Sequence, residues 1–177
     1  MRRATVPFVA LVTLLVFLAG GALAQGGPPS PDATPGASGV SGGALGGIDA
    51  SVVPGYRLVM AETVFAPGSY VTQHTHPTAI VVCVHEGALG FALQAGMATV
   101  TRSETRATPE AAEQLALDTD VVLDPGDCVA FDEFAAHTVH TAWNASEETT
   151  IIWEARLMKT DEPFTTFVDA MGTPVAS

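Results

Sequence analysis

Residues 56–157 consist of short β-favouring runs separated by Gly, Pro and Asn turns, and this pattern constrains the fold most strongly. The runs are rich in Val, Ile, Phe, Tyr and Trp, the residues enriched in strands. They cover residues 56–65, 70–76, 79–85, 88–93, 128–131, 137–143 and 149–157. No long helical period interrupts them, so the pattern predicts an all-β sandwich or barrel.

The chain begins with the features of an export signal. Arg2 and Arg3 precede an apolar run over residues 6–19, and Ala22-Leu23-Ala24 has the small-x-small pattern of a cleavage site. The run is short for a membrane span, so residues 1–24 are predicted to be a secretory signal peptide cleaved near Ala24. The mature protein is then expected to be secreted or periplasmic and not membrane-bound; a retained anchor is the alternative.

Residues 25–50 are rich in Gly, Pro, Ser and Ala and show no apolar period. A segment of this composition cannot build a core, so it is predicted to be a disordered linker. The folded part is expected over residues 51–160, the size of one small domain. Residues 161–177 are interpreted as a C-terminal tail.

The formal net charge is −12, from 7 basic and 19 acidic residues. Loss of the predicted signal peptide would remove Arg2 and Arg3 and no acidic residue. A protein this acidic does not attract nucleic acid or anionic membranes through its general field. The charge therefore argues against both classes of partner.

Two cysteines, Cys83 and Cys128, lie in a chain that is predicted to be exported, where a disulfide can persist. Sequence spacing does not decide between a bridge and two buried small side chains. Side chains alternate faces along a strand, so if His74 faces the interior, Cys83 faces away from it. Cys83 is therefore not counted as a metal ligand.

The stretch from Gly68 to Gly87 carries His74-Thr75-His76 within β-favouring sequence. Alternate residues of a strand share a face, so both imidazoles are expected to point the same way. Neutral imidazole is a common ligand for zinc, iron, copper and nickel. Together with a third histidine on a distant strand, the pair forms a candidate metal site.

Two segments resemble the sequence motifs of the cupin superfamily. Gly68, five residues, His74-x-His76 and then Gly87 resemble the first motif, and residues 126–137 (GDCVAFDEFAAH) resemble the second. The resemblance covers about residues 56–157. It implies a single double-stranded β-helix, or jelly-roll barrel, with the site inside its mouth. Cupins often form dimers, so the resemblance is also compatible with a homodimer.

The first motif departs from the cupin pattern at Ile80. In cupins a glutamate seven residues before the closing glycine usually joins the histidines, and here that position holds isoleucine. Ile80 has the same parity as His74 and His76 and is expected to face the site. Three neutral histidine ligands would not offset the charge of a divalent ion, and they would leave coordination positions open on it. Cupins with three-histidine sites include thiol dioxygenases. The metal of this candidate site is expected to be Fe, Mn, Ni or Zn.

The second motif leaves two choices for the third histidine. If the spacing of the motif is counted forward from Gly126, the motif histidine is His137. If it is counted back from Asn144, the motif histidine is His140. The Gly-Asp turn is expected to set the strand that feeds the site, so His137 is the preferred ligand and His140 the alternative. Strict alternation then places His140 outside the site unless the strand bulges.

The predicted barrel cavity has apolar walls. The candidate lining residues are Ile80, Phe91, Phe131 and Trp143. Core packing is the alternative role for the three aromatic residues. Glu133 and His140 are the candidate acid–base residues, and Asn144-Ala145-Ser146 forms an N-glycosylation sequon.

These features leave three functions open, the last of which is a degenerate barrel used only for association and presented outside the cell by the linker. In the first, the protein is an exported metal-dependent enzyme that acts on a small molecule, with oxygenase chemistry as the leading class. In the second, it is a non-catalytic module whose apolar cavity binds a small ligand without a functional metal. Cupin folds host unrelated activities, so the resemblance does not choose between them or establish catalysis.

Overall fold

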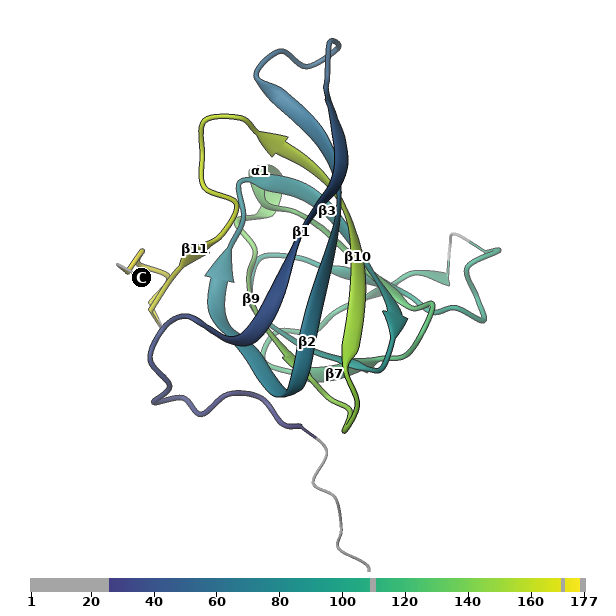
Figure 1. Cartoon of the computed structure of the whole chain (residues 1–177), viewed down its shortest axis with the longest axis vertical. Helices are drawn as coiled ribbons and strands as arrows, with labels where there is room; N and C mark the ends of the chain where they lie inside the picture. The colour runs from purple at the N-terminus through teal and green to yellow at the C-terminus, as the bar shows by residue number, and fades with distance from the viewer. Residues whose placement is uncertain (1–25, 109–110, 170, 176–177) are drawn as a thin grey trace, which may run out of the picture.

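The computed structural model describes residues 26–108, 111–169 and 171–175. This part of the chain is nearly all β, with the short helix α1 at Glu133–Ala136 (Figure 1). The strands are β1 (Ala37–Asp49), β2 (Tyr56–Thr75), β3 (Thr78–Glu86), β4 (Leu89–Ala95), β5 (Thr99–Thr101), β6 (Glu113–Gln114), β7 (Asp120–Leu123), β8 (Cys128–Asp132), β9 (Val139–Asn144), β10 (Thr150–Lys159) and β11 (Thr166–Phe167). Within the described ranges no helix is long and apolar enough to cross a membrane. The predicted signal peptide, residues 1–24, lies outside them.

Strand β2 belongs to both halves of one curled antiparallel sheet. Its first half pairs with β10, and the order continues through β3 and β8 to β5 and β6. Its second half pairs with β9, and the order continues through β4 to β7. This exchange of neighbours is the jelly-roll arrangement, and the two halves face each other across the interior (Figure 1). The predicted all-β barrel is confirmed.

The transfer of β2 between the two halves occurs near Gly68. The sequence predicts a turn at Pro67-Gly68, but the strand continues through these residues as it bends. Gly68 has a φ of 73°, in the left-handed region that glycine enters without strain. The bend carries His74 into the second half of the sheet, beside β9.

The core fills the space between the two halves of the sheet. Alternate residues of β3 point inward, with Ile80, Val82 and Val84 buried and Val81 exposed. The most deeply buried aliphatic side chains are Leu89, Leu93, Val100, Leu123 and Val129. The apolar alternation of the strands therefore determines which face each side chain takes.

Cys83 of β3 and Cys128 of β8 are register partners and form a disulfide. Cys83 alternates with the inward residues Val82 and Val84, so the bridge lies on the outer face of the barrel. Of the two alternatives left open by the sequence, a disulfide or two buried small side chains, the structure has the disulfide. Cys83 faces away from the histidines, as expected.

Part of the predicted disordered linker is instead a strand. Residues 37–49 form β1, which pairs with β2 from Ala37↔Val71 to Asp49↔Arg57. The edge of β2 carries backbone N–H and C=O groups that need partners, and these outweigh the low strand propensity of Gly, Ala and Ser. At Gly42 an added Cβ would lie 2.2 Å from the carbonyl oxygen of Glu62, so glycine permits the close approach.

The predicted C-terminal tail, residues 161–177, also contains ordered structure. Strand β11 pairs with the end of β2, with Thr166 opposite Thr75 and Phe167 opposite His74. The folded unit therefore extends beyond residue 160. These residues cover the mouth of the barrel, next to the histidines that the sequence singles out.

Asn144, the first residue of the glycosylation sequon, is fully buried at the end of β9. Its Nδ2 donates hydrogen bonds to the carbonyl oxygens of Phe65, Ala66 and Glu148, at 3.0, 3.1 and 2.7 Å. A glycan would have to attach to this same nitrogen, so the folded chain offers no acceptor at the sequon. Asn144 instead fixes the turn between β9 and β10.

Candidate metal centre

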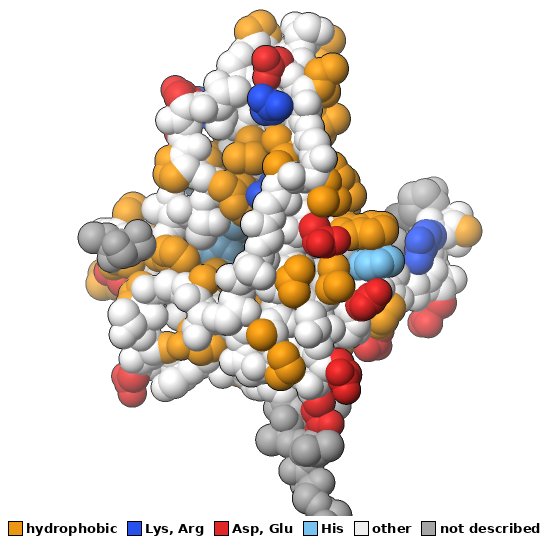
Figure 2. Space-filling view, in the orientation of Figure 1, with side chains coloured by type: hydrophobic (Ala, Val, Ile, Leu, Met, Phe, Trp, Pro, Cys, Tyr) orange, Lys and Arg blue, Asp and Glu red, His pale blue; other side chains and the backbone are white. Residues whose placement is uncertain are grey.

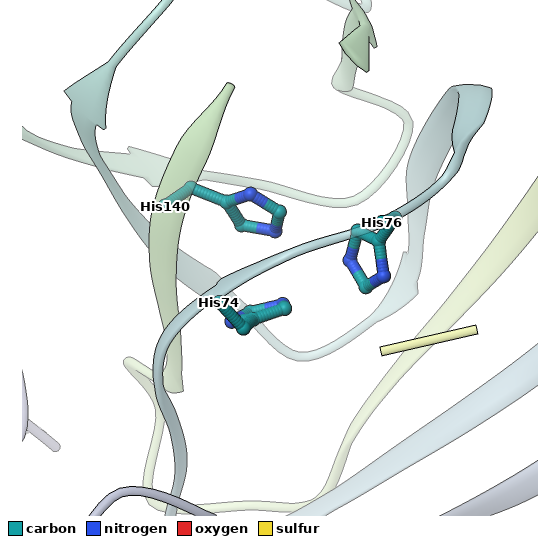
Figure 3. Close-up of side chains that lie close together, drawn as sticks. All are labelled: His74, His76 and His140. Atoms are coloured by element: carbon teal, nitrogen blue, oxygen red, sulfur yellow. The ribbon is translucent and has the colours of Figure 1, made fainter. Parts of the chain in front are cut away.

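Three histidines converge inside the barrel mouth. His74 comes from the end of β2, His76 follows directly after this strand, and His140 comes from the neighbouring strand β9 (Figure 3). All three are buried, and one ring nitrogen of each lies within 4.8 Å of the others. Both side chains of the His74/His76 pair turn to the same interior face, as the alternation of side chains along a strand predicts.

Backbone carbonyls orient two of the three rings. The Nδ1 of His74 lies 2.7 Å from the carbonyl oxygen of Thr72, and the Nδ1 of His76 lies 2.8 Å from that of Phe164. A carbonyl oxygen can only accept a hydrogen bond, so in each neutral ring Nδ1 carries the proton. The lone pair of each ring is therefore on Nε2, which is free to bind a metal ion.

The ring of His140 is enclosed by aromatic side chains. It stacks on Phe91 at a centroid distance of 4.9 Å and contacts Phe131 at 4.7 Å. Its Nδ1 is buried and has no hydrogen-bond partner among the described residues. Buried polar atoms almost always have a partner, which a bound ion or water would supply here. The donor set therefore fits a divalent metal that prefers nitrogen ligands.

Burial keeps all three rings neutral. It lowers the pKa of His74 to about 4, and it lowers the pKa of His76 and of His140 well below the ordinary value. Each charged ring would also repel the others at these short separations. The histidines are thus already in the protonation state that metal binding needs at neutral pH.

His137, the preferred third ligand from the sequence, is not part of this group. It is exposed and caps the C-terminus of α1 with a left-handed φ of 50°. The residues between β8 and β9 form this helical turn, so β9 begins only at Val139. His137 precedes the strand, so the alternation of side chains along β9 cannot be counted from it. The alternative histidine, His140, lies in the site instead.

A cavity of about 400 Å³ adjoins the histidines. Three of the predicted lining residues, Ile80, Phe91 and Phe131, line it. The opening lies beside β1, where histidine and apolar side chains are visible in Figure 2. Residues of β1 form one wall, so the segment predicted to be a linker helps to enclose the site.

Trp143 does not line this cavity. It is opposite Gly90 on β4, and its ring occupies the space that a side chain there would fill, with an added Cβ only 2.0 Å from the ring. It packs with Ala92 and Ala145 in a separate apolar cluster. Trp143 lies on β9 at odd spacing from His140, so the period-two rule places it on the opposite face.

Glu133, a candidate acid–base residue, lies outside the histidine cavity. It starts α1 and lines a second, more open pocket together with Thr75 and His137. The hydroxyl of Thr75 donates to one carboxyl oxygen, and the other oxygen is buried with no partner among the described residues. Burial raises the pKa of Glu133 to about 8.

Sequence reasoning missed a charged pair in the cavity wall. Glu154 and Arg156 of β10 both line the cavity, and Nε of Arg156 donates to Oε2 of Glu154 at 2.7 Å. The hydroxyl of Thr63 donates to the other oxygen of Glu154 at 2.6 Å. The signal was present in the sequence, because Ile152, Glu154 and Arg156 share one parity and therefore one face of β10.

Phe164, from the predicted tail, is the second omission. Its carbonyl oxygen holds His76, and its ring stacks on the His76 ring at 4.3 Å between centroids. Phe164 also lies under the guanidinium of Arg156, whose Cζ is 3.4 Å from the ring centroid. No local pattern marks this residue, because it acts through a contact between distant parts of the chain.

No protein-family model matches the chain, and no curated protein matches its sequence. Similar solved structures include the cupin 2 domain-containing protein from Halorhodospira halophila, with 20% identity over 77% of this chain and 73% of that chain and a TM-score of 0.47. KdgF from Halomonas sp. has 18% identity over 70% of this chain and 84% of that chain, with a TM-score of 0.45. The vicilin from Solanum melongena has 13% identity over 63% of this chain and 26% of that chain, with a TM-score of 0.43. These similarities concern the fold, and the chemistry of the site rests on the residues of this chain.

Proposed function

We propose that this chain is a cupin-type protein that binds one divalent transition metal ion through His74, His76 and His140. The supporting observation is the convergence of three buried, neutral imidazoles with their ligand atoms within 4.8 Å of one another. Two of these rings are held by carbonyl oxygens in the tautomer that leaves Nε2 free. Iron, manganese, nickel and zinc all accept such a ligand set.

We further propose that the metal serves a reaction on a small molecule bound in the adjoining cavity. When bound, the ion would supply Lewis-acid chemistry or activation of dioxygen. Ile80 is buried in the cavity wall at the position where the cupin motif has glutamate. The proposed ligand set therefore contains neutral imidazoles and no carboxylate, and the apolar rings of Phe91 and Phe131 line the adjoining cavity.

Metal content tests this proposal. The protein, purified without chelators, is expected to contain close to one equivalent of a transition metal by elemental mass spectrometry. The variant His74→Ala/His76→Ala should lose it, because two of the three ligands are removed. A content below about 0.2 equivalents in the wild type, together with no rise in melting temperature on addition of Fe, Mn, Ni or Zn, would overturn the proposal.

A non-catalytic binding module is the second candidate. It is favoured by the apolar walls and by the engagement of Glu154, which lines the cavity but is already bound by Arg156 and Thr63. The same double variant separates the two functions. Ligand binding that is unchanged after loss of His74 and His76 would support the module and exclude a metal-centred reaction.

We propose that the protein works outside the cytoplasm. The disulfide between Cys83 and Cys128 supports this location, because structural disulfides persist in oxidising compartments. The leader-like residues 1–24 support it independently. Sequencing the N-terminus of the protein recovered from its native host tests the proposal, with cleavage near Ala24 as the expected result and an intact Met1 as the contrary one.

A further inference from the structure

Arg156 is a largely enclosed cation that the metal site does not use. It lies on β10, lines the same cavity as the three histidines, and has only 12% of its side chain exposed. The other described walls of this cavity are apolar or neutral, apart from Glu154. A charged group in such surroundings is costly unless it has partners, so the way in which Arg156 is held indicates its role.

One edge of the guanidinium is occupied and the other is free. Nε and Nη2 of Arg156 both contact Oε2 of Glu154. Nη1 makes no hydrogen bond to any described residue. A guanidinium carries five N–H groups in a planar fork, so the two on Nη1 remain available to an acceptor inside the cavity.

Phe164 ties this cation to the histidine group. Its ring centroid is 3.4 Å from Cζ of Arg156 and 4.3 Å from the ring centroid of His76. Thr63 fixes Glu154 from the other side, at 2.6 Å. The guanidinium is thus held rigidly by an ion pair and an aromatic face, in the manner of a preorganised binding group.

The charge balance of the cavity favours an anion once a metal is bound. Among the described lining residues, Arg156 is the basic one and Glu154 the acidic one, and they offset each other. The three histidines are neutral, so a divalent ion would leave the cavity with a net positive charge. A ligand with one negative charge would reduce this excess, whereas a cation would increase it.

We propose that Arg156 binds the carboxylate of a small monoanionic ligand, whose apolar body occupies the cavity beside the three histidines. This inference rests on the proposed metal-binding function for the position of the ligand. The apolar walls contact the hydrocarbon part, and the free Nη1 edge binds the carboxylate oxygens. The cavity of about 400 Å³ accommodates a ligand with a single aromatic ring or a short branched chain.

Benzoate is a suitable probe, and benzamide is its neutral counterpart. Binding of both is measured by calorimetry with cobalt-loaded and metal-free protein. Arg156→Gln is expected to weaken benzoate binding by about tenfold or more, because a charge-assisted hydrogen bond is lost. Binding of benzamide should be the same in the wild type and in Arg156→Gln. Equal benzoate affinity in the wild type and in Arg156→Gln would overturn the proposal, as would the absence of benzoate binding to the wild type.

Glu154→Gln is the complementary variant. It removes the competing carboxylate and leaves Arg156 charged, so benzoate binding should become several-fold tighter. A purely structural role for the pair predicts weaker binding in both variants. The double variant Arg156→Gln/Glu154→Gln leaves no unpaired buried charge, and it keeps the test valid if Arg156→Gln alone fails to fold.

The cobalt content of each sample separates the two proposals. Protein that binds no cobalt but binds benzoate through Arg156 would overturn the metal function and retain the carboxylate site. Protein that binds cobalt but shows no Arg156-dependent preference for benzoate over benzamide would overturn the carboxylate site alone.

Discussion

His74 of β2 and His140 of β9 are direct register partners, with ring centroids 4.1 Å apart. Antiparallel partners point to the same face of a sheet, so both rings lie inside the barrel. His76, two residues beyond His74, joins them on this face. The register of one strand pair therefore determines which histidines form the group.

The first prediction compares His140 with His137. His140→Ala should lower the affinity for zinc or cobalt at least tenfold, because one of three ligands is removed. His137→Ala should leave the affinity unchanged, since His137 is an exposed helix cap outside the group. Competition against a metallochromic chelator measures both. A larger loss in His137→Ala than in His140→Ala would contradict the assignment.

The second prediction concerns Ile80. Ile80→Glu should destabilise the metal-free protein by roughly 2 kcal/mol or more, because it buries a carboxyl group among apolar side chains. Added metal should recover part of this loss if the ion sits near residue 80. Val81→Glu, on the exposed face of the same strand, is the control and should have little effect. Urea unfolding with and without metal provides the measurement.

The third prediction concerns the segment after β10. A chain ending at Thr160 lacks the Phe164 carbonyl that holds Nδ1 of His76, so its metal affinity should fall roughly tenfold or more. The variant Phe164→Leu keeps that carbonyl and should retain most of the affinity. Circular dichroism checks that the barrel is intact. Full affinity in the shortened chain would show that residues 161–177 do not support the site.

The fourth prediction concerns the pH dependence of stability. The carboxyl of Glu133 ionises at an ordinary pKa of 4.5 when unfolded, whereas burial raises its pKa to about 8 in the folded state. The folded protein therefore holds an extra proton between these values, and the contribution of Glu133 to stability falls as pH rises through this window. The limit is about 1.4 kcal/mol per pH unit.

Glu133→Gln should remove this decline, so that the variant gains stability relative to the wild type from pH 5 to 8. The buried histidines act in the opposite sense, because their lowered pKa makes stability rise with pH below about 6.5. Comparing the variant with the wild type at each pH cancels their effect. Parallel profiles from urea unfolding would show that Glu133 does not titrate in this range. Exposed Glu147→Gln serves as the control.

The fifth prediction concerns the disulfide. Cys83→Ser/Cys128→Ser should lower the free energy of unfolding by about 2–4 kcal/mol, because the bridge closes a long loop of the unfolded chain. Metal content should not change, since the bridge lies on the outer face of β3. Denaturant unfolding and elemental analysis test both parts. Loss of metal in the folded variant would show that the bridge supports the site.

Much of the candidate site follows from local pattern. The period-two rule places His74, His76 and Ile80 on one face, and all three side chains are buried there. The same rule applied to β10 would have identified Glu154 and Arg156. It would also have excluded Trp143 once His140 was known to face inward.

The sequence by itself determined the all-β barrel, the face of each strand residue and the first two histidines, because these depend on turns and on alternation along one strand. Only the tertiary structure decided the third histidine, since α1 delays the start of β9 and its pairing with β2 places His140 opposite His74. Tertiary structure also turned residues 37–49 into β1 and brought Phe164 over His76. Such contacts depend on the unpaired edge and open mouth of the assembled barrel, which no local stretch of sequence encodes.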